Sequence, residues 1–152
     1  PMSAFSAGPQ AQQPLRAAGY RIAPFICYEI VYGGLVAKSA RDADLLVTIS
    51  NDSWFVDSIG PWQHLQIAQM RGRENGRFVL RATNSGISAI IDHQGHIVKR
   101  TEQFVATTLT GEAEVMLGNT PFSSFGNIPI IAGCFISLLL MALMYIGFWR
   151  DN

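Results

Sequence analysis

The stretch ADLLVTIS, residues 43–50, decides how this chain folds, because its large aliphatic side chains follow one another almost without interruption. A strand with one face in water alternates apolar and polar residues, whereas a strand buried on both faces is a nearly continuous apolar run. We therefore predict that residues 43–50 form a strand in a sheet that is covered on both sides.

The sequence before and after this strand predicts an α/β layer. Residues 20–27 are apolar enough for another strand, although Pro24 restricts that strand to an edge or an irregular start. A short helix is expected over residues 30–41, between the two strands. A second helix is expected from Pro61, which is tolerated in a first turn, to about residue 75. Strands that alternate with helices are typical of an α/β fold.

The second half of the chain predicts a series of short strands joined by tight turns. Three apolar segments, at residues 78–82, 87–92 and 96–99, are separated by the turn sequences NSG at 84–86 and HQG at 93–95. We expect these segments to form a meander of hairpins, and residues 104–117 to add one more strand.

Charge is scarce and unevenly distributed. The 11 basic residues balance the 11 acidic ones, and charged residues make up only 14% of the chain, which argues against nucleic acid as a partner. No Asp, Glu, Lys, Arg or His occurs between Val115 and Trp149. About 20 apolar residues suffice for a helix to cross a bilayer. We predict a transmembrane helix over residues 127–149 and a cytoplasmic tail over residues 150–152, because Arg150 follows the apolar run directly.

The two cysteines lie in different settings. Cys134 falls within the apolar run, where a thiol packs as a small hydrophobic side chain. Cys27 falls where a strand gives way to a helix, so that helix amides can favour its thiolate, and Tyr28 and Glu29 follow it. A single cysteine at a strand end is more often a packing residue than a nucleophile, and the residues alone leave both roles open.

Four stretches carry a resemblance to a known family: PFICYE at 24–29, LVTISNDSWF at 46–55, GPWQH at 60–64 and RATNSGIS at 81–88. They resemble the nitrilase (carbon–nitrogen hydrolase) superfamily and, more closely, its membrane-bound apolipoprotein N-acyltransferases. The resemblance implies the carboxyl-terminal part of a nitrilase-like periplasmic domain over residues 1–126, a partial α-β-β-α sandwich, followed by one transmembrane helix. Because the chain starts with Pro1, it is expected to be a piece of a longer protein.

The resemblance also implies a catalytic mechanism. The family uses a cysteine nucleophile, which corresponds to Cys27, with a Glu general base and a Lys that stabilises the oxyanion; both partners are expected upstream of Pro1, so these 152 residues alone should be inactive. Tyr28 and Glu29 match positions that the family associates with activity. Trp54, Phe55 and Trp62 either line an acyl pocket or rest at the membrane interface; their alternative role is to pack at the edge of the core.

The implied reaction moves a fatty acyl chain from a phospholipid, through a Cys27 thioester, to the α-amino group of the N-terminal diacylglyceryl-Cys of an apolipoprotein. We therefore expect a monomer in the bacterial inner membrane, with its catalytic domain facing the periplasm and with phospholipid, apolipoprotein and the bilayer as partners. No cofactor is expected, and no metal, because His64, His93 and His96 lack the spacing of metal ligands.

Two other functions stay open on the sequence alone. A membrane-tethered, nitrilase-like amidase would keep Cys27 but pass the acyl group to water. A non-catalytic periplasmic domain would lack the Glu and the Lys even in the full-length protein. Analysis of the reaction products separates the first alternative from the transferase, and the upstream sequence tests the second.

Overall fold

The computed structural model describes residues 12–150, which form an α/β fold with one mixed sheet, as predicted. The strands are β1 (Leu15–Ala17), β2 (Tyr20–Ile26), β3 (Leu45–Ser50), β4 (Val79–Thr83), β5 (Ala89–Ile91) and β6 (Ile97–Arg100). The α-helices are α1 (Gly33–Ala40), α2 (Gly60–Asn75), α3 (Pro121–Phe125) and α4 (Ile128–Arg150), and two short 3-10 helices are η1 (Cys27–Val31) and η2 (Asp52–Phe55).

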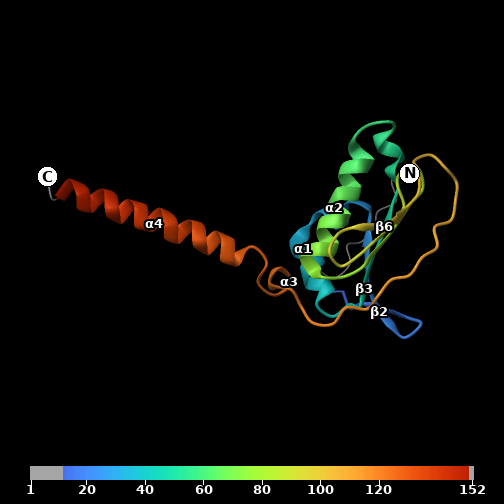
Figure 1. Cartoon of the computed structure of the whole chain (residues 1–152), viewed down its shortest axis with the longest axis horizontal. Coiled ribbons are helices and arrows are strands. Elements are labelled where there is room, and N and C mark those ends of the chain that lie inside the picture. Colours follow the sequence, from blue (N-terminus) through green and yellow to red (C-terminus); the bar gives the residue numbers. More distant parts are fainter. Residues whose placement is uncertain (1–11, 151–152) are drawn as a thin grey trace, which may run out of the picture.

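The sheet has parallel strands at its centre and antiparallel strands at its margins. Its strand order follows the chain from β1 to β6, with β2, β3 and β4 parallel to one another. The strands β4, β5 and β6 form the predicted meander of antiparallel neighbours. The helix α1 lies between β2 and β3 in the chain and α2 between β3 and β4, and Figure 1 shows both helices beside the sheet.

The main hydrophobic core lies between the sheet and the helices α1 and α2. From β3, the side chains of Leu46, Thr48 and Ser50 are all buried. Leu46 belongs to the apolar cluster that also contains Val36 of α1 and Leu65 of α2. The strand β3 therefore contributes both to the core and, through its last residue, to the end of the sheet where η2 begins.

The prediction of a strand over residues 104–117 is wrong. The structure has no strand there: Leu109, Ala113 and Met116 instead pack against a second, smaller cluster that includes Leu45 and Phe78. A segment that packs across the face of a sheet presents side chains to it, so its backbone is not placed to extend the hydrogen-bonded ladder. Local apolar character predicted the burial of this segment but not its partner.

The second face of the sheet is covered over only part of its area. Leu45 is buried, whereas Ile49 is 58% exposed and Ile26 is 68% exposed. The predicted double cover is thus found at the amino end of β3 and not at its carboxyl end, within residues 12–150. Pro24 behaves as predicted in part: β1 makes β2 an interior strand, but their pairing reaches only Ile22, so at Pro24 the only described neighbour is β3.

The helix α4 is long and apolar, and it is exposed over Ile128–Ile146. Ile128–Ile146 has a mean hydropathy of 2.3, and none of this segment is buried against the rest of the described chain. Pro129 is the second residue of the helix, where its missing amide proton costs no helical hydrogen bond. By length and composition, α4 can cross a membrane. The last two residues of the predicted tail, 151–152, lie outside the described residues.

Candidate active site

An open groove lies at the carboxyl ends of the parallel strands. Its volume is about 520 Å³, and it is lined by Ile26, Cys27, Ile49, Ser50, Asn51, Ala82, Thr83 and Asn84, which come from the ends of β2, β3 and β4 and the residues after them. Parallel strands bring their carboxyl ends to one edge of a sheet, and ligands of open α/β sheets bind outside that edge. Cys27 is the only residue of this lining with a thiol.

The backbone of Cys27 is held in an unusual conformation. Its φ angle is +52°, in the left-handed region, directly where β2 ends and η1 begins. For a residue with a side chain this costs of the order of 1–3 kcal/mol, and such residues cluster at functional sites. The Glu29 carboxylate stabilises the turn, because its Oε2 accepts a 2.7 Å hydrogen bond from the Ile26 amide. Glu29 therefore closes the loop around Cys27 instead of lining the groove.

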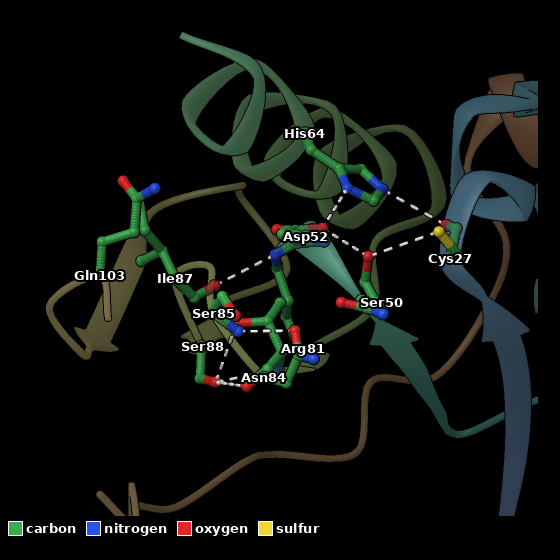
Figure 2. Close-up of polar contacts among 12 residues, drawn as sticks. Cys27, Ser50, Asp52, His64, Arg81, Asn84, Ser85, Ile87, Ser88 and Gln103 are labelled. Atoms are coloured by element: carbon green, nitrogen blue, oxygen red, sulfur yellow. Dashed lines mark hydrogen bonds and ion pairs between the residues drawn. The ribbon is translucent and has the colours of Figure 1, made fainter. Parts of the chain in front are cut away.

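The hydroxyl of Ser50, the last residue of β3, connects Cys27 to a buried carboxylate. Ser50 Oγ lies 3.6 Å from Cys27 Sγ and 2.5 Å from Asp52 Oδ1. Figure 2 shows the three side chains in a row, with the serine oxygen between the sulfur and the carboxylate.

The Asp52 carboxylate is the centre of a buried polar cluster. It is 1% exposed; its Oδ1 lies 3.1 Å from His64 Nδ1, and its Oδ2 accepts a 2.5 Å hydrogen bond from Arg81 Nη2. Burial by itself raises the pKa of Asp52, but the hydrogen bonds from His64 and Ser50 and the charge of Arg81 outweigh it and lower that pKa. The carboxylate is therefore ionised at neutral pH. Burial also lowers the pKa of Arg81, an effect that Asp52 opposes.

His64 connects the same cluster to the backbone of Cys27. It is 4% exposed on the first turns of α2, and its Nε2 lies 3.3 Å from the Cys27 carbonyl oxygen. Asp52 thus reaches Cys27 by two routes: through Ser50 to the sulfur and through His64 to the carbonyl (Figure 2). A strained backbone persists only where its surroundings over-determine it, and this cluster provides such surroundings.

The other residues predicted for the site lie outside the groove lining. Tyr28 is exposed and packs edge-on against Tyr32, with the ring centres 6.0 Å apart. Trp54 is 85% exposed, and the Trp62 ring lies 4.8 Å from the guanidinium carbon of Arg100. Phe55 packs edge-on against the His64 ring. The role of Trp54, Phe55 and Trp62 in binding an acyl chain stays a prediction.

Four residues of this cluster were not selected from the sequence: Ser50, Asp52, His64 and Arg81. A signal for one of them was present, because Arg81 is a charged residue within the apolar strand β4. A buried guanidinium requires a nearby carboxylate. The sequence does not show, however, that the carboxylate comes from the loop after β3. Among residues 12–150, no three His, Cys, Asp or Glu side chains are grouped as a metal site requires.

The chain resembles known proteins over most of its length. Residues 3–120 match the carbon–nitrogen hydrolase family model. The chain is 48% identical over 148 residues to a protein named apolipoprotein N-acyltransferase from Pasteurella multocida, a match that covers 97% of this chain and 28% of that protein. A protein of the same name from Haemophilus influenzae is 48% identical over 145 residues, which are 95% of this chain and 28% of that protein. The chain thus spans a little over a quarter of the length of these relatives.

A solved structure supports the fold. The carbon–nitrogen hydrolase from Helicobacter pylori superimposes with a TM-score of 0.59 over 65% of this chain and 42% of that chain, at 12% sequence identity. At this identity the likeness concerns the fold alone, and it agrees with the predicted α/β architecture.

Proposed function

The chain belongs to the carbon–nitrogen hydrolase family, and from this premise we propose that it forms part of a membrane-bound N-acyltransferase. The proposed reaction carries a fatty acyl chain from a phospholipid, through a thioester on Cys27, to the α-amino group of the N-terminal diacylglyceryl-Cys of an apolipoprotein. The names of the two relatives at 48% identity support the substrate class.

One observation carries this proposal: the only thiol in the groove lining sits on a strained turn at the carboxyl ends of the parallel strands. A packing cysteine needs neither the left-handed backbone nor the access to the groove. Ile26, Ile49 and Ala82 contribute apolar side chains to the same lining, and they suit a fatty acyl chain better than a charged substrate.

The proposed chemistry proceeds in two steps. The Cys27 thiolate attacks the acyl ester carbon; the carbon–sulfur bond forms, the carbon–oxygen bond breaks, and the lysophospholipid oxygen takes up a proton. The amine then attacks the thioester; the carbon–nitrogen bond forms, the carbon–sulfur bond breaks, the electron pair returns to sulfur, and the nitrogen gives up one proton to the general base. We propose that a Glu and a Lys from the part of the protein that corresponds to the uncovered length of the relatives act as the base and the oxyanion donor for these steps.

The helix α4 supports a location in the inner membrane. Its exposed apolar surface over Ile128–Ile146 is long enough to span the hydrocarbon core. We place Arg150 on the cytoplasmic side and residues before about 126 on the periplasmic side. A catalytic domain tethered in this way stays within reach of phospholipid and of lipid-modified protein, with no cofactor and as a monomer.

Intact-mass measurement of the native protein tests the function. The full-length protein that contains these residues is purified from membranes, supplied with phospholipid, and weighed before and after treatment with hydroxylamine, which cleaves thioesters. We expect a fatty-acyl mass on Cys27 that hydroxylamine removes and that an acceptor lipopeptide discharges as the N-acylated product. An unmodified Cys27 would overturn the proposal, and release of free fatty acid in place of the N-acyl product would favour the amidase-like hydrolase.

A further inference from the structure

The Ser50 hydroxyl is shared between two acceptors. Its oxygen lies 2.5 Å from Asp52 Oδ1 and 3.6 Å from Cys27 Sγ. A hydroxyl carries one proton and can donate it in only one direction at a time. While the sulfur is a neutral thiol or a thioester, the ionised Asp52 is the stronger acceptor, and the proton points to it.

The balance between the two acceptors changes when the sulfur becomes a thiolate. In the proposed reaction this happens twice: before Cys27 attacks the donor ester, and again when the amine displaces it from the thioester. A thiolate is a charged acceptor, and hydrogen bonds to charged groups are about twice as strong as neutral ones. Both acceptors are then charged, and the hydroxyl stabilises the site more by donating to the sulfur, because the carboxylate keeps Arg81 and His64 as partners.

Asp52 can release the Ser50 proton because it keeps other partners. Arg81 Nη2 still donates to Oδ2 at 2.5 Å, and His64 Nδ1 still faces Oδ1 at 3.1 Å. The carboxylate thus remains hydrogen-bonded in the buried cluster when the serine turns away, and the penalty for an unsatisfied buried charge does not arise.

We propose that Ser50 is a further catalytic residue, whose hydroxyl proton points to Asp52 while Cys27 is a thiol or thioester and turns to Sγ whenever Cys27 is a thiolate. The role of this hydroxyl in catalysis rests on the acyl transfer proposed above. The contact itself belongs to Cys27 and Ser50 alone and can be tested without a lipid substrate.

Four other titratable or charged side chains lie near Cys27 in the described chain, and each has a defined contact. The charge of Arg81 interacts with that of the Cys27 thiolate. Asp52 accepts from Ser50, and His64 contacts the Cys27 carbonyl oxygen. Glu29 accepts a hydrogen bond from the Ile26 amide. Replacement of Ser50 by Ala removes none of these charged groups, and Asp52 keeps Arg81 and His64 as partners. A change in the titration of Cys27 in this variant therefore reports the hydroxyl.

The test measures how fast Cys27 reacts with iodoacetamide as a function of pH, in the native full-length protein, with modification read on the Cys27 peptide by mass spectrometry. In Ser50→Ala the thiolate loses a donor, so we expect the pH midpoint of alkylation to rise by about one unit, which means roughly tenfold less thiolate at a given pH below the midpoint. The rate of acyl-enzyme formation should fall with it, whereas the KM for phospholipid should not change.

Thr48→Val is the matched control. Thr48 lies two residues earlier on β3, is buried like Ser50, and its hydroxyl has no hydrogen-bond partner among the described residues. This variant should keep the wild-type alkylation midpoint. Ser50→Thr retains a hydroxyl at the same position and should also keep the wild-type alkylation midpoint. If Ser50→Ala does not fold, a shifted midpoint in Ser50→Thr would overturn the role of the hydroxyl.

The outcomes separate this proposal from the function. An unchanged midpoint in folded Ser50→Ala, or an equal shift in Ser50→Thr, would overturn the role of the Ser50 hydroxyl even if wild-type protein forms the thioester. A raised midpoint in Ser50→Ala, in a protein that forms no thioester, would uphold the contact between Ser50 and Cys27 while the acyl transfer fails.

Discussion

At the scale of single residues, the site depends on one strained cysteine and the groups that hold it. Cys27 has a φ of +52°, and its neighbours Glu29, Ser50 and His64 each contact a different part of the turn: the Ile26 amide, the sulfur and the carbonyl. The strain is thus opposed by several independent contacts. We therefore expect replacement of Cys27 to affect mainly activity, and replacement of Arg81 in the buried cluster to affect mainly stability.

The two cysteines should respond differently to replacement. We expect Cys27→Ala to abolish acyl transfer and thioester formation, because no other thiol lines the groove. Cys134→Ala should leave both unchanged, because Cys134 lies on the exposed apolar surface of α4, away from the groove. Transfer of labelled acyl chains to an acceptor lipopeptide measures both variants, and equal losses in the two would contradict the assignment.

Loss of the Arg81 side chain should destabilise the domain strongly. Arg81→Met leaves the buried Asp52 charge without its guanidinium partner, and breaking a buried pair by removing one member costs about 3–5 kcal/mol. Thermal unfolding of the native protein in detergent measures the effect as a lowered midpoint. Arg21→Met is the control, because Arg21 pairs with Asp44 at the surface and its loss should change the midpoint little. Similar midpoints for the two variants would rule out a structural role for the buried pair.

At the scale of elements, four elements bring the polar cluster together in one place. The strand β3 ends in Ser50, η2 begins with Asp52, the first turns of α2 carry His64, and β4 carries Arg81. Gly86, in the turn between β4 and β5, makes this approach possible: a Cβ at this position would lie 2.2 Å from Asp52 Oδ2. The turn that the sequence predicts at residues 84–86 thus also provides the space for the carboxylate.

Gly86→Ala should therefore displace Asp52 and weaken the whole cluster. We expect the variant to lose about 1–3 kcal/mol of stability, as overpacked sites do, and to lose thioester formation at Cys27 as well. Gly34→Ala provides the comparison, because a Cβ at Gly34, within α1, would meet nothing within 4 Å. That change should be neutral or slightly stabilising, since Ala favours a helix over Gly. A fully active Gly86→Ala protein would show that the close approach has no consequence.

At the scale of the whole molecule, a short anchored segment joins the sheet domain to the long helix. Arg77 Nη2 donates to the Gly118 carbonyl at 2.7 Å, and Arg41 Nε donates to the Ser123 carbonyl at 2.6 Å. Figure 1 shows α4 running away from the domain beyond this point, with α3 at the junction. The segment before α4 is therefore tied to the sheet domain by Arg41, directly after α1, and by Arg77, shortly after α2, whereas Ile128–Ile146 of α4 is not buried against the rest of the described chain.

The environment of α4 can be measured through its own cysteine. If α4 spans the membrane, a water-soluble maleimide should label Cys134 poorly in intact membranes and readily after solubilisation in denaturing detergent. The orientation follows from Leu117→Cys, at a residue that is 91% exposed before α3; it should be labelled from the periplasmic side only. Rapid labelling of Cys134 in intact membranes would contradict the span, and labelling of position 117 from the cytoplasmic side only would reverse the orientation.

The sequence was a good guide to the elements and a partial guide to the site. The strands around residues 20–27 and 43–50, the helix from Pro61 and the meander after it were predicted close to their observed bounds, because each has its own apolar period and its own turn residues. The structure of residues 104–117 was not predicted correctly, because apolar character indicates that a segment is buried but not which part of the molecule it packs against. Cys27 could be selected only together with its resemblance to a family, since a single cysteine has no distinctive pattern.

By itself, the sequence determined the order of the strands and helices between residues 20 and 100, the apolar length of α4 and the family of the chain, all of which depend on neighbouring residues or on similarity along the chain. Only the tertiary structure decided that Ser50, Asp52, His64 and Arg81 form one buried cluster behind Cys27. The physical reason is that their hydrogen bonds join segments up to 37 positions apart, and such contacts exist only once the parallel strands have brought their carboxyl ends together.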